Sequence, residues 1–337
     1  MKYTVPLFAL VVMACNTPSQ NADSNLISTV ESITDPLPSW NEGANKEAII
    51  QYVKTVTDKN SKDYIAPSDR IATFDNDGTL WSEQPLYFQL FFAIDRITEL
   101  APEHPEWESE EPFASVLKGD LNGALAGGEE SIIKLVMVSH SGVTSTEFNS
   151  IATNWIDTAK HPISGKNYTQ LVYQPMLELL DYLRAHDFKT FIVSGGGIDF
   201  MRPWSEAVYG IPSEQVVGSG VEIEFEMTDS GPVLNRLPKM NFIDDKAGKP
   251  VGIQRHIGKK PVFAAGNSDG DLQMLQWTDS NEHLSFQLYI HHTDSVRETA
   301  YDREGPIGKL DKGWDEAVEK GWTVADMAKD WNTVWPE

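Results

Sequence analysis

Three polar clusters in the sequence contain residue types that together suit phosphoryl transfer. They are Asp75-Asn76-Asp77-Gly78-Thr79, Ser194-Gly195-Gly196-Gly197 and Gly266-Asn267-Ser268-Asp269-Gly270-Asp271. Carboxylate oxygens are hard ligands of the kind that Mg²⁺ prefers. A serine hydroxyl, glycine amides and a lysine such as Lys249 can hold the oxygens of a phosphoryl group. The sequence therefore carries the parts of a phosphoryl-transfer site.

Each of these features also has an ordinary structural explanation when it is taken alone. Two aspartates before a glycine commonly form a turn. A glycine run after a strand is as often a tight turn as a phosphate cradle. A single lysine is normally a solvated charge. The combination of all three clusters with Lys249, in this order, favours catalysis over these explanations.

A short apolar segment of strand type precedes each cluster. These segments are residues 70–74, 189–193 and 261–265, and a further strand is predicted at 284–290. Helical patterns alternate with them, for instance at 176–183 and 249–257, and Val221 to Leu234 has the pattern of a hairpin across Asp229-Ser230-Gly231. This repetition predicts an α/β fold with a Rossmann-like, three-layer parallel sheet, in which the polar clusters meet at the carboxyl ends of the strands.

Residues 82–168 have a different pattern, which is helical throughout. Residues 86–100 are almost continuously apolar, residues 131–138 form a second apolar stretch, and Thr144-Ser145-Thr146-Glu147 has the form of a capping box. We therefore predict a helical domain at 82–168, inserted into an α/β core formed by residues 46–81 and 169–337.

In this order, the clusters resemble the four motifs of the haloacid dehalogenase superfamily. Residues 74–80 resemble its first motif, DxDGT after a hydrophobic strand, and Ser194 after 190–193 resembles the second. Lys249 in Gly248-Lys249-Pro250 resembles the third motif, and residues 266–271 resemble the fourth. The resemblance covers residues 70–275 and is strongest to the phosphoserine phosphatase-like branch. It implies that the helical insertion is a cap domain over the site.

The resemblance also implies catalytic roles for the matching residues. Asp75 would be the nucleophile that forms an aspartyl-phosphate. Asp77 would protonate the leaving oxygen and then activate water, which favours a phosphatase over a dehalogenase. Ser194 would hold the phosphoryl group, and Lys249 would neutralise charge there. The backbone of Gly195 and Gly196 would complete this cradle.

For the cofactor, the resemblance implies Mg²⁺ held by the Asp75 carboxylate, the Asp77 backbone carbonyl and the fourth motif. That motif departs from the family, because Asn267 stands where an aspartate is usual; an amide oxygen can bind Mg²⁺ but carries no charge. Asp271 matches the second acid of the motif, and Asp269 is an alternative ligand.

Several other residues are weaker candidates for the site. Lys246 competes with Lys249 for the third motif, but Ile253 and Ile257 follow Lys249 at helical spacing. Arg202 is a weaker candidate for a phosphate contact. The pair His291-His292 is expected to be exposed rather than in the pocket. For an aromatic pocket around a cationic substrate group, Trp81, Trp107 and Trp155 are candidates, although packing between cap and core explains them more simply.

From these residues we expect a Mg²⁺-dependent phosphatase acting on a small phosphorylated metabolite through an aspartyl-phosphate. Transfer to an acceptor hydroxyl, or pyrophosphate hydrolysis, is the alternative within the same fold. A lipoprotein that binds phosphorylated ligands without turnover is the alternative from a different class, and Asn267 motivates it.

The first residues resemble the signal peptide of a bacterial lipoprotein. Lys2 precedes an apolar run of about nine residues, too short for a membrane span, and a small residue comes directly before Cys15, as in a lipobox. We therefore expect a signal peptide at 1–14, lipidation at Cys15, a flexible tether at 15–45 and a location in the bacterial cell envelope, outside the cytoplasm. Membrane association would occur only through this lipid.

The overall composition limits the partners. The 337 residues include 27 Lys and Arg against 50 Asp and Glu, giving a formal charge of −23. This excess of acid argues against a nucleic-acid partner, since phosphate backbones are bound by surplus basic residues. Cys15 is the only cysteine, which excludes an intramolecular disulfide and a cysteine-based zinc site.

Overall fold

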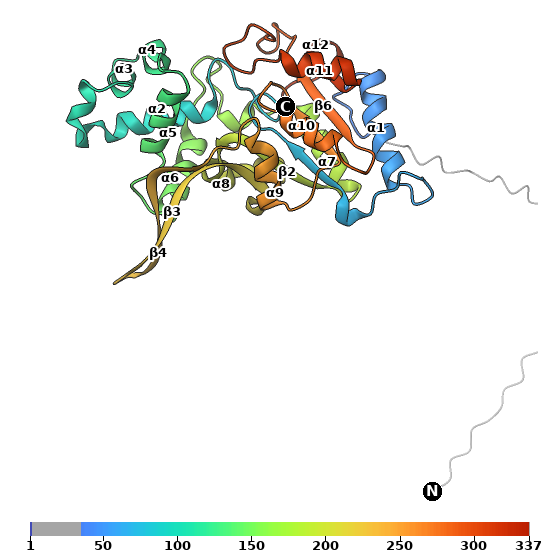
Figure 1. The fold of residues 1–337 in the computed structure, drawn as a ribbon, viewed down its shortest axis with the longest axis horizontal. Coiled ribbons are helices and arrows are strands. Elements are labelled where there is room, and N and C mark those ends of the chain that lie inside the picture. The colour runs from blue at the N-terminus through green and yellow to red at the C-terminus, as the bar shows by residue number, and fades with distance from the viewer. Residues whose placement is uncertain (2–34, 337) are drawn as a thin grey trace, which may run out of the picture. The chain divides into compact units, whose positions relative to one another are not determined.

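A seven-stranded sheet with the order β4-β3-β2-β1-β5-β6-β7 forms the centre of the fold (Figure 1). The computed structural model describes Met1 and residues 35–336. All neighbouring strands are parallel except β3 and β4, which form an antiparallel hairpin. The strands are β1 (Ile71–Phe74), β2 (Lys189–Gly197), β3 (Val216–Thr228), β4 (Gly231–Phe242), β5 (Phe263–Gly266), β6 (Phe286–His291) and β7 (Thr323–Asp326).

Helices cover both faces of this sheet. Successive residues of a strand point to opposite faces and therefore pack into two separate apolar clusters. In β2, for example, Ile192 belongs to one apolar cluster and Val193 to the other, as expected from the period of two along a strand. The first cluster includes residues of α1 (Ala44–Thr57), α7 (Gln174–Ala185) and α8 (Ile198–Tyr209). The second includes residues of α9 (Gly248–His256), α10 (Leu272–Asp279) and α11 (Lys312–Lys320). The predicted three-layer α/β architecture is confirmed.

The register of the central strands brings the polar clusters together. Phe74 at the end of β1 pairs with Ile192 of β2 on one side and Ala265 of β5 on the other. Because the strands are parallel, the residues that follow each of them lie at the same edge of the sheet.

Residues 82–168 fold into helices and contain no strand. They are α2 (Phe88–Leu100), α3 (Phe113–Leu117), α4 (Leu121–Leu125), α5 (Glu129–Ser139) and α6 (Ser145–Thr158), with two short 3-10 helices between α2 and α3. The capping box predicted at Thr144 and Glu147 begins α6. Helices α2 to α5 have an apolar cluster of their own, whereas α6 packs on α8 and joins the main core.

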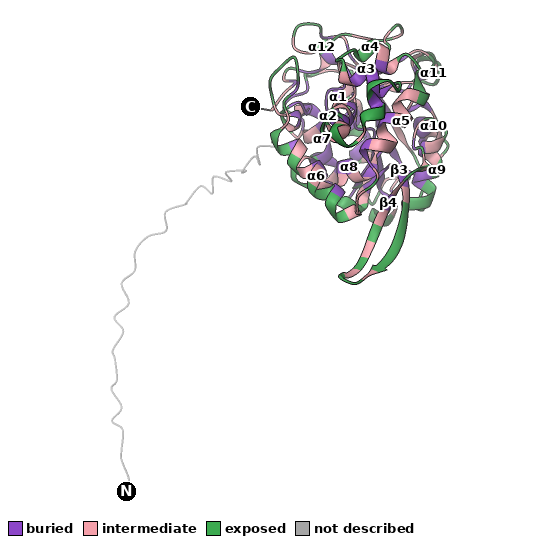
Figure 2. Ribbon diagram, turned by 90° about the vertical axis from the view of Figure 1, so that its left-hand side faces the viewer, coloured by how far each residue is buried: buried purple, intermediate pink, exposed green. Residues whose placement is uncertain are grey.

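The predicted hairpin is present and is longer than the sequence pattern indicated, with strands of 13 and 12 residues. It projects from the body, and its outer part is largely exposed (Figures 1 and 2). Exposed apolar side chains, including Phe225 and Met227, lie along this outer part. Its inner part contributes to the site described below.

At both ends of the chain the structure differs from the expected boundaries. Leu37 and Trp40, which were predicted to lie in a tether, are buried, and the Trp40 ring packs edge-on against Trp331. The folded body therefore begins before residue 46. Strand β7, α11 and the short α12 (Met327–Asp330) were not predicted.

The predicted signal peptide, Cys15 and most of the tether lie outside the described residues. Within the part that is described, no helix is both long and apolar enough to cross a membrane.

Candidate active site

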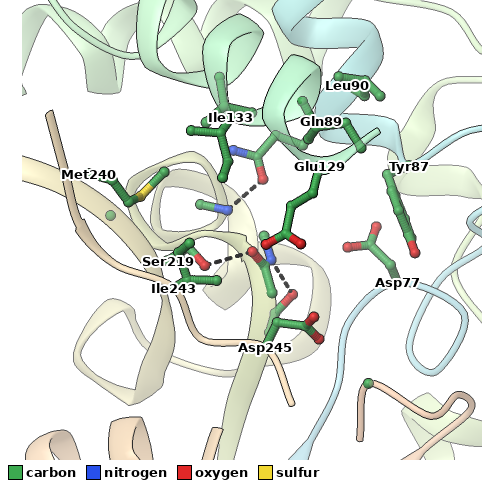
Figure 3. A pocket seen from close by; sticks show the side chains of 18 of the residues that line it. Asp77, Tyr87, Gln89, Leu90, Glu129, Ile133, Ser219, Met240, Ile243 and Asp245 are labelled. Atoms are coloured by element: carbon green, nitrogen blue, oxygen red, sulfur yellow. Dashed lines mark hydrogen bonds between the residues drawn. The ribbon is translucent and has the colours of Figure 1, made fainter. Parts of the chain in front are cut away.

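A pocket of about 410 Å³ opens at the carboxyl ends of β1 and β2 (Figure 3). Residues of all four motifs line it, and the fourth contributes Ser268 and Gly270 as well as Asp271. The predicted site residues among them are Asp75, Asp77, Ser194, Gly195, Gly196, Lys249 and Asp271. Residues that are up to 196 positions apart in the sequence are thus brought to one site by the strand order.

Lys249 is the centre of the hydrogen-bond network at the base of the pocket. Its Nζ donates to Asp75 Oδ1 and Asp271 Oδ1, both at 2.6 Å, and to the Val193 carbonyl at 2.9 Å. Burial lowers the pKa of Lys249, but the charges of Asp271 and Asp75 outweigh this effect and hold it above its ordinary value. Lys249 therefore stays charged. Burial, and then the charge of Asp271, raise the pKa of Asp75 well above its ordinary value, and the charge of Lys249 opposes this rise.

Lys246, the competing lysine, has a different environment. Its side chain is 64% exposed and pairs with the adjacent Asp245 at 3.3 Å. It lies in the turn before α9 with a positive φ of 51°, whereas Lys249 lies within the first turn of that helix and is 2% exposed. Of the two lysines, only Lys249 contacts Asp75.

Asp77 faces the pocket beside Tyr87 (Figure 3). Trp81 Nε1 donates to Asp77 Oδ1 at 2.8 Å. Burial raises the pKa of Asp77 to about 6, against the opposing effects of Trp81 and Lys249. A carboxyl group with such a pKa can hold a proton near neutral pH and release it to a leaving group, as a general acid must.

The glycine-rich end of β2 is fixed from two sides. Gly196 N–H donates to Ser194 Oγ at 3.1 Å, and Gly197 N–H donates to Gln89 Oε1 of α2 at 2.5 Å. The amide nitrogen of Gln89 in turn donates to His140 Nε2 at 2.6 Å. Burial, and then the charge of Arg236, lower the pKa of His140 to about 3, so its ring is neutral and can accept. A helix of the inserted segment thus directly contacts the glycine loop.

The two acids of the fourth motif, Asp269 and Asp271, are engaged in hydrogen bonds with neighbouring groups. Asp271 Oδ2 accepts the N–H groups of Asn267 and Ser268 at 3.0 and 3.1 Å, while its other oxygen binds Lys249. Asp269 Oδ1 accepts the N–H groups of Asp311 and Gly313, both at 2.9 Å. Asp269 is therefore engaged with the start of α11, which does not fit the alternative metal role considered for it.

Glu83 is a buried pocket acid that the sequence analysis missed. Its Oε1 accepts a hydrogen bond from Asn267 Nδ2 at 2.6 Å and one from the Tyr301 hydroxyl at 2.7 Å. Burial raises the pKa of Glu83 well above its usual range, and the charges of Asp77 and Asp75 raise it further. The available signal was an acid eight residues after Asp75, just outside the recognised motif.

His292 supports the first motif from behind, so the expectation that it is exposed was wrong. It is 2% exposed, and its Nε2 donates to the Gly78 carbonyl at 2.7 Å. The ring of Tyr301 stacks on the His292 ring at 4.3 Å, and Glu298 lies 3.4 Å from Nδ1. The segment after β6 thus fixes the turn that carries Asp75 and Asp77.

The other candidates, Arg202 and the three tryptophans, are not among the residues that line the pocket. Arg202 pairs with Asp199 at 3.3 Å and donates to the Ser213 carbonyl. The three tryptophans stack within the core: Trp81 on Trp204, Trp107 on Phe113 and Trp155 on Tyr168. They form no pocket for a cationic group. The aromatic and guanidinium side chains that do line the pocket are Tyr87 and Arg236.

Apolar side chains form part of the pocket wall, together with single acids (Figure 3). Ile133 comes from α5, Met240 from β4 and Ile243 from the turn after it. The carboxylates of Glu129 and Asp245 also face the pocket. Both the inserted helices and the hairpin therefore shape the space next to the catalytic residues.

The donor chemistry at the first and fourth motifs fits Mg²⁺. Asp75 and Asp77 supply carboxylate and backbone oxygens, and Asn267 supplies an amide oxygen, all hard donors, while Mg²⁺ commonly keeps several water ligands. Lys249 pairs with Asp75 and Asp271, and Asp77 and Glu83 line the same pocket. Among the described residues, no three His, Cys, Asp or Glu side chains form a metal cluster by themselves. The Mg²⁺ site would therefore use backbone and amide oxygens as well as carboxylates.

This site and fold are those of a hydrolase family. The model of haloacid dehalogenase-like hydrolases matches residues 72–276, and the chain belongs to this family. The matched region begins in β1 and ends within α10, so it contains all four motifs and the helices inserted between the first two.

Solved structures resemble the chain at low identity, and no curated protein matches it. A functionally unknown protein from Anaerococcus prevotii is 15% identical, with 78% of this chain and 89% of that chain covered and a TM-score of 0.45. A phosphoserine phosphohydrolase-like protein from Francisella tularensis is 14% identical, with 74% and 99% covered and a TM-score of 0.37. A probable phosphoserine phosphatase from Vibrio cholerae is 15% identical, with 79% and 71% covered and a TM-score of 0.38.

Proposed function

We propose that the protein is a Mg²⁺-dependent phosphatase that hydrolyses small phosphomonoesters through an aspartyl-phosphate on Asp75. The observation that carries this proposal is the contact of Lys249 with both Asp75 and Asp271 at the base of a pocket that also holds Asp77. In this arrangement Lys249 favours the carboxylate form of Asp75, the nucleophile, beside a second carboxyl group that can hold a proton.

In the first step, a carboxylate oxygen of Asp75 forms a bond to phosphorus while the bond to the leaving oxygen breaks. Asp77 gives its proton to that oxygen, and the alcohol leaves. In the second step, Asp77 takes a proton from water, the water oxygen attacks phosphorus, and the bond to Asp75 breaks to release phosphate. Lys249 stabilises the negative charge throughout.

Ser194 and the amides of Gly195 and Gly196 would hold the phosphoryl oxygens at the end of β2. Asp75, the Asp77 carbonyl and Asn267 would hold Mg²⁺, which when bound neutralises phosphoryl charge. Asp271 has both oxygens engaged with Lys249 and the loop of the fourth motif, so we assign it a positioning role rather than the predicted metal contact.

The inserted helices support a small substrate. Residues from α2 and α5 form part of the pocket wall, so the phosphoester must fit between these helices and the sheet edge. A closed pocket excludes water from the reaction and disfavours a macromolecular phosphate target. The lipobox-like sequence before Cys15 supports a position in the cell envelope.

There are two alternatives to hydrolysis, and each predicts a different outcome of the test below. Transfer of the phosphoryl group to another hydroxyl would use the same residues, with an alcohol in place of water. Binding without turnover is favoured by one observation, the neutral Asn267 in the fourth motif.

Release of phosphate from a panel of small phosphoesters with Mg²⁺ tests the proposal, comparing the intact chain with Asp75→Asn. We expect turnover of at least one ester by the intact chain, and a loss of about 1,000-fold or more in Asp75→Asn because the nucleophile is removed. Equal activity in both would contradict the assignment of Asp75. Binding of esters without any turnover would favour the binding protein, and product formation only with an added alcohol would favour transfer.

A further inference from the structure

We propose that Glu83 and Asn267 act as one unit in the Mg²⁺ site, with Glu83 carrying the negative charge that Asn267 lacks. Glu83 would position the amide of Asn267 and supply charge one hydrogen bond away from the cation. This inference rests on the proposed function, since it concerns the same Mg²⁺ site.

The hydrogen bonds of Asn267 fix the orientation of its side-chain amide. Its Nδ2 donates to Glu83 Oε1 at 2.6 Å, and its Oδ1 accepts from the Thr79 hydroxyl at 3.1 Å. A carbonyl oxygen has two lone pairs, so Oδ1 keeps one for a metal ion. If Glu83 were absent, the buried amide nitrogen would lose its acceptor and the orientation of the group would no longer be fixed.

The charges around Glu83 also favour a cation, because only a cation or a proton can neutralise a carboxylate buried there. Within residues 35–336, Glu83 forms no ion pair, and its two hydrogen-bond donors, Asn267 and Tyr301, are neutral. Lys249 is already shared between Asp75 and Asp271. A buried carboxylate near Asp75 and Asp77 is strongly disfavoured unless positive charge lies nearby.

The backbone is shaped to keep this unit in place. Gly78 has φ of +72°, and a Cβ added there would collide with the Asn267 amide and the Glu83 carboxylate. His292 holds the Gly78 carbonyl, and Tyr301, which stacks on His292, donates to Glu83. Glu83 and Asn267 are therefore packed directly against the turn of the first motif.

The test is a double-mutant cycle of Glu83→Gln and Asn267→Asp. Titration calorimetry without substrate measures the affinity for Mg²⁺ of the wild-type protein, of each single variant and of the double variant. Glu83→Gln alone should weaken Mg²⁺ binding about 10- to 100-fold, as removal of groups that orient metal ligands commonly does. Asn267→Asp alone should bring little gain, because it places a second carboxylate against Glu83. In the double variant the charge and the amide exchange places, so affinity should return to within a few-fold of the wild-type value.

The matched control is Glu129→Gln, which removes one carboxylate of the same pocket, at the start of α5, and should leave Mg²⁺ affinity unchanged because Glu129 has no hydrogen bond to Asn267. Additive effects of the two substitutions would overturn the proposal, and so would an unchanged affinity in Glu83→Gln. If Glu83→Gln does not fold, Asn267→Asp carries the test: a tenfold tighter Mg²⁺ affinity in that variant would overturn the proposal.

The wild-type measurements separate this inference from the proposed function. A wild-type protein that neither binds Mg²⁺ nor hydrolyses any ester contradicts the proposed function. A wild-type protein that does both, with no coupling between Glu83 and Asn267, contradicts the paired role alone.

Discussion

At the scale of single residues, Asp244 is a buried acid next to the site with unusual surroundings. It is 0% exposed, and among the described residues neither carboxylate oxygen has a hydrogen-bond partner. It packs against Gly252 in α9, the helix that carries Lys249. Burial raises the pKa of Asp244 to about 7, with Lys249 opposing the rise and Asp245 adding to it.

This environment predicts a pH-dependent cost in stability that Asp244→Asn removes. The pKa is raised in the folded state, so the cost is absent below the unfolded pKa of about 3.9, grows as pH rises and is complete above about 7. The free energy of unfolding of Asp244→Asn, relative to the wild-type protein, should therefore increase by about 2–4 kcal/mol between pH 4.5 and pH 8. Urea unfolding at a series of pH values measures it.

Asp245→Asn is the control for this experiment, because Asp245 is only partly buried and faces the pocket. Its free energy of unfolding relative to wild type should change little over the same pH range. Parallel curves for Asp244→Asn and the wild-type protein would show that Asp244 is not destabilised by ionisation.

At the scale of elements, the position of α9 brings one of two nearby lysines into the site. Its first turn directs Lys249 to Asp75 and Asp271, while Lys246 stays in the exposed turn before the helix. Lys249→Ala should lose about 100-fold or more in kcat, because a charge-stabilising group at the reaction centre is removed. Lys246→Ala should lose far less. Kinetics with the best ester of the panel measure both.

Melting curves accompany these assays, because Lys249→Ala leaves two buried carboxylates without their cation and is expected to lower stability. The comparison is made at a temperature at which both variants are folded. A larger loss in Lys246→Ala than in Lys249→Ala would reassign the third motif to Lys246.

The sequence predicts those elements and site residues that have a recognisable pattern in the residues next to them. Asp75, Asp77, Ser194 and Lys249 were identifiable because each follows an apolar strand or begins a helix. The contacts of Glu83 with Asn267 and Tyr301 join residues 184 and 218 positions apart, and no local pattern indicates them.

Strand β7 and the burial of His292 were missed for a related reason, because neither has a clear local signal in the sequence. The strand β7, Thr323–Asp326, is as short as β1 and β5, but it begins and ends with a polar residue and only Ala325 is buried, so it lacks the apolar run that indicated those two strands. His292 follows a strand end as an exposed residue would, yet the chain folds back over it and buries it against Gly78. Burial of this kind depends on tertiary packing rather than on neighbouring residues.

At the scale of the whole molecule, the net charge of −23 opposes the approach of an anionic substrate. The repulsion acts over the Debye length, which falls from about 30 Å at 0.01 M salt to about 8 Å at 0.15 M. With Mg²⁺ saturating, kcat/KM should therefore rise by about two- to threefold when NaCl is raised from 10 to 150 mM. Initial rates at low substrate concentration measure this effect.

A neutral viscosity control separates this effect from diffusion, because added sucrose slows encounter without screening charge. A fall in kcat/KM with salt would mean that local positive charge at the pocket outweighs the acidic surface. The lipid at Cys15 remains a prediction, and it would not alter this balance.

The hydrogen bond between Gln89 in α2 and the amide of Gly197 has a kinetic consequence. If α2 moves away from the sheet to admit a substrate, this bond must break, and the loop that follows Ser194 loses its outer support. Entry of the ester and relaxation of the phosphoryl-binding loop are then a single event. Tight binding of the phosphate and fast release of the product therefore need not compete, because the movement that opens the pocket also weakens the binding of phosphate.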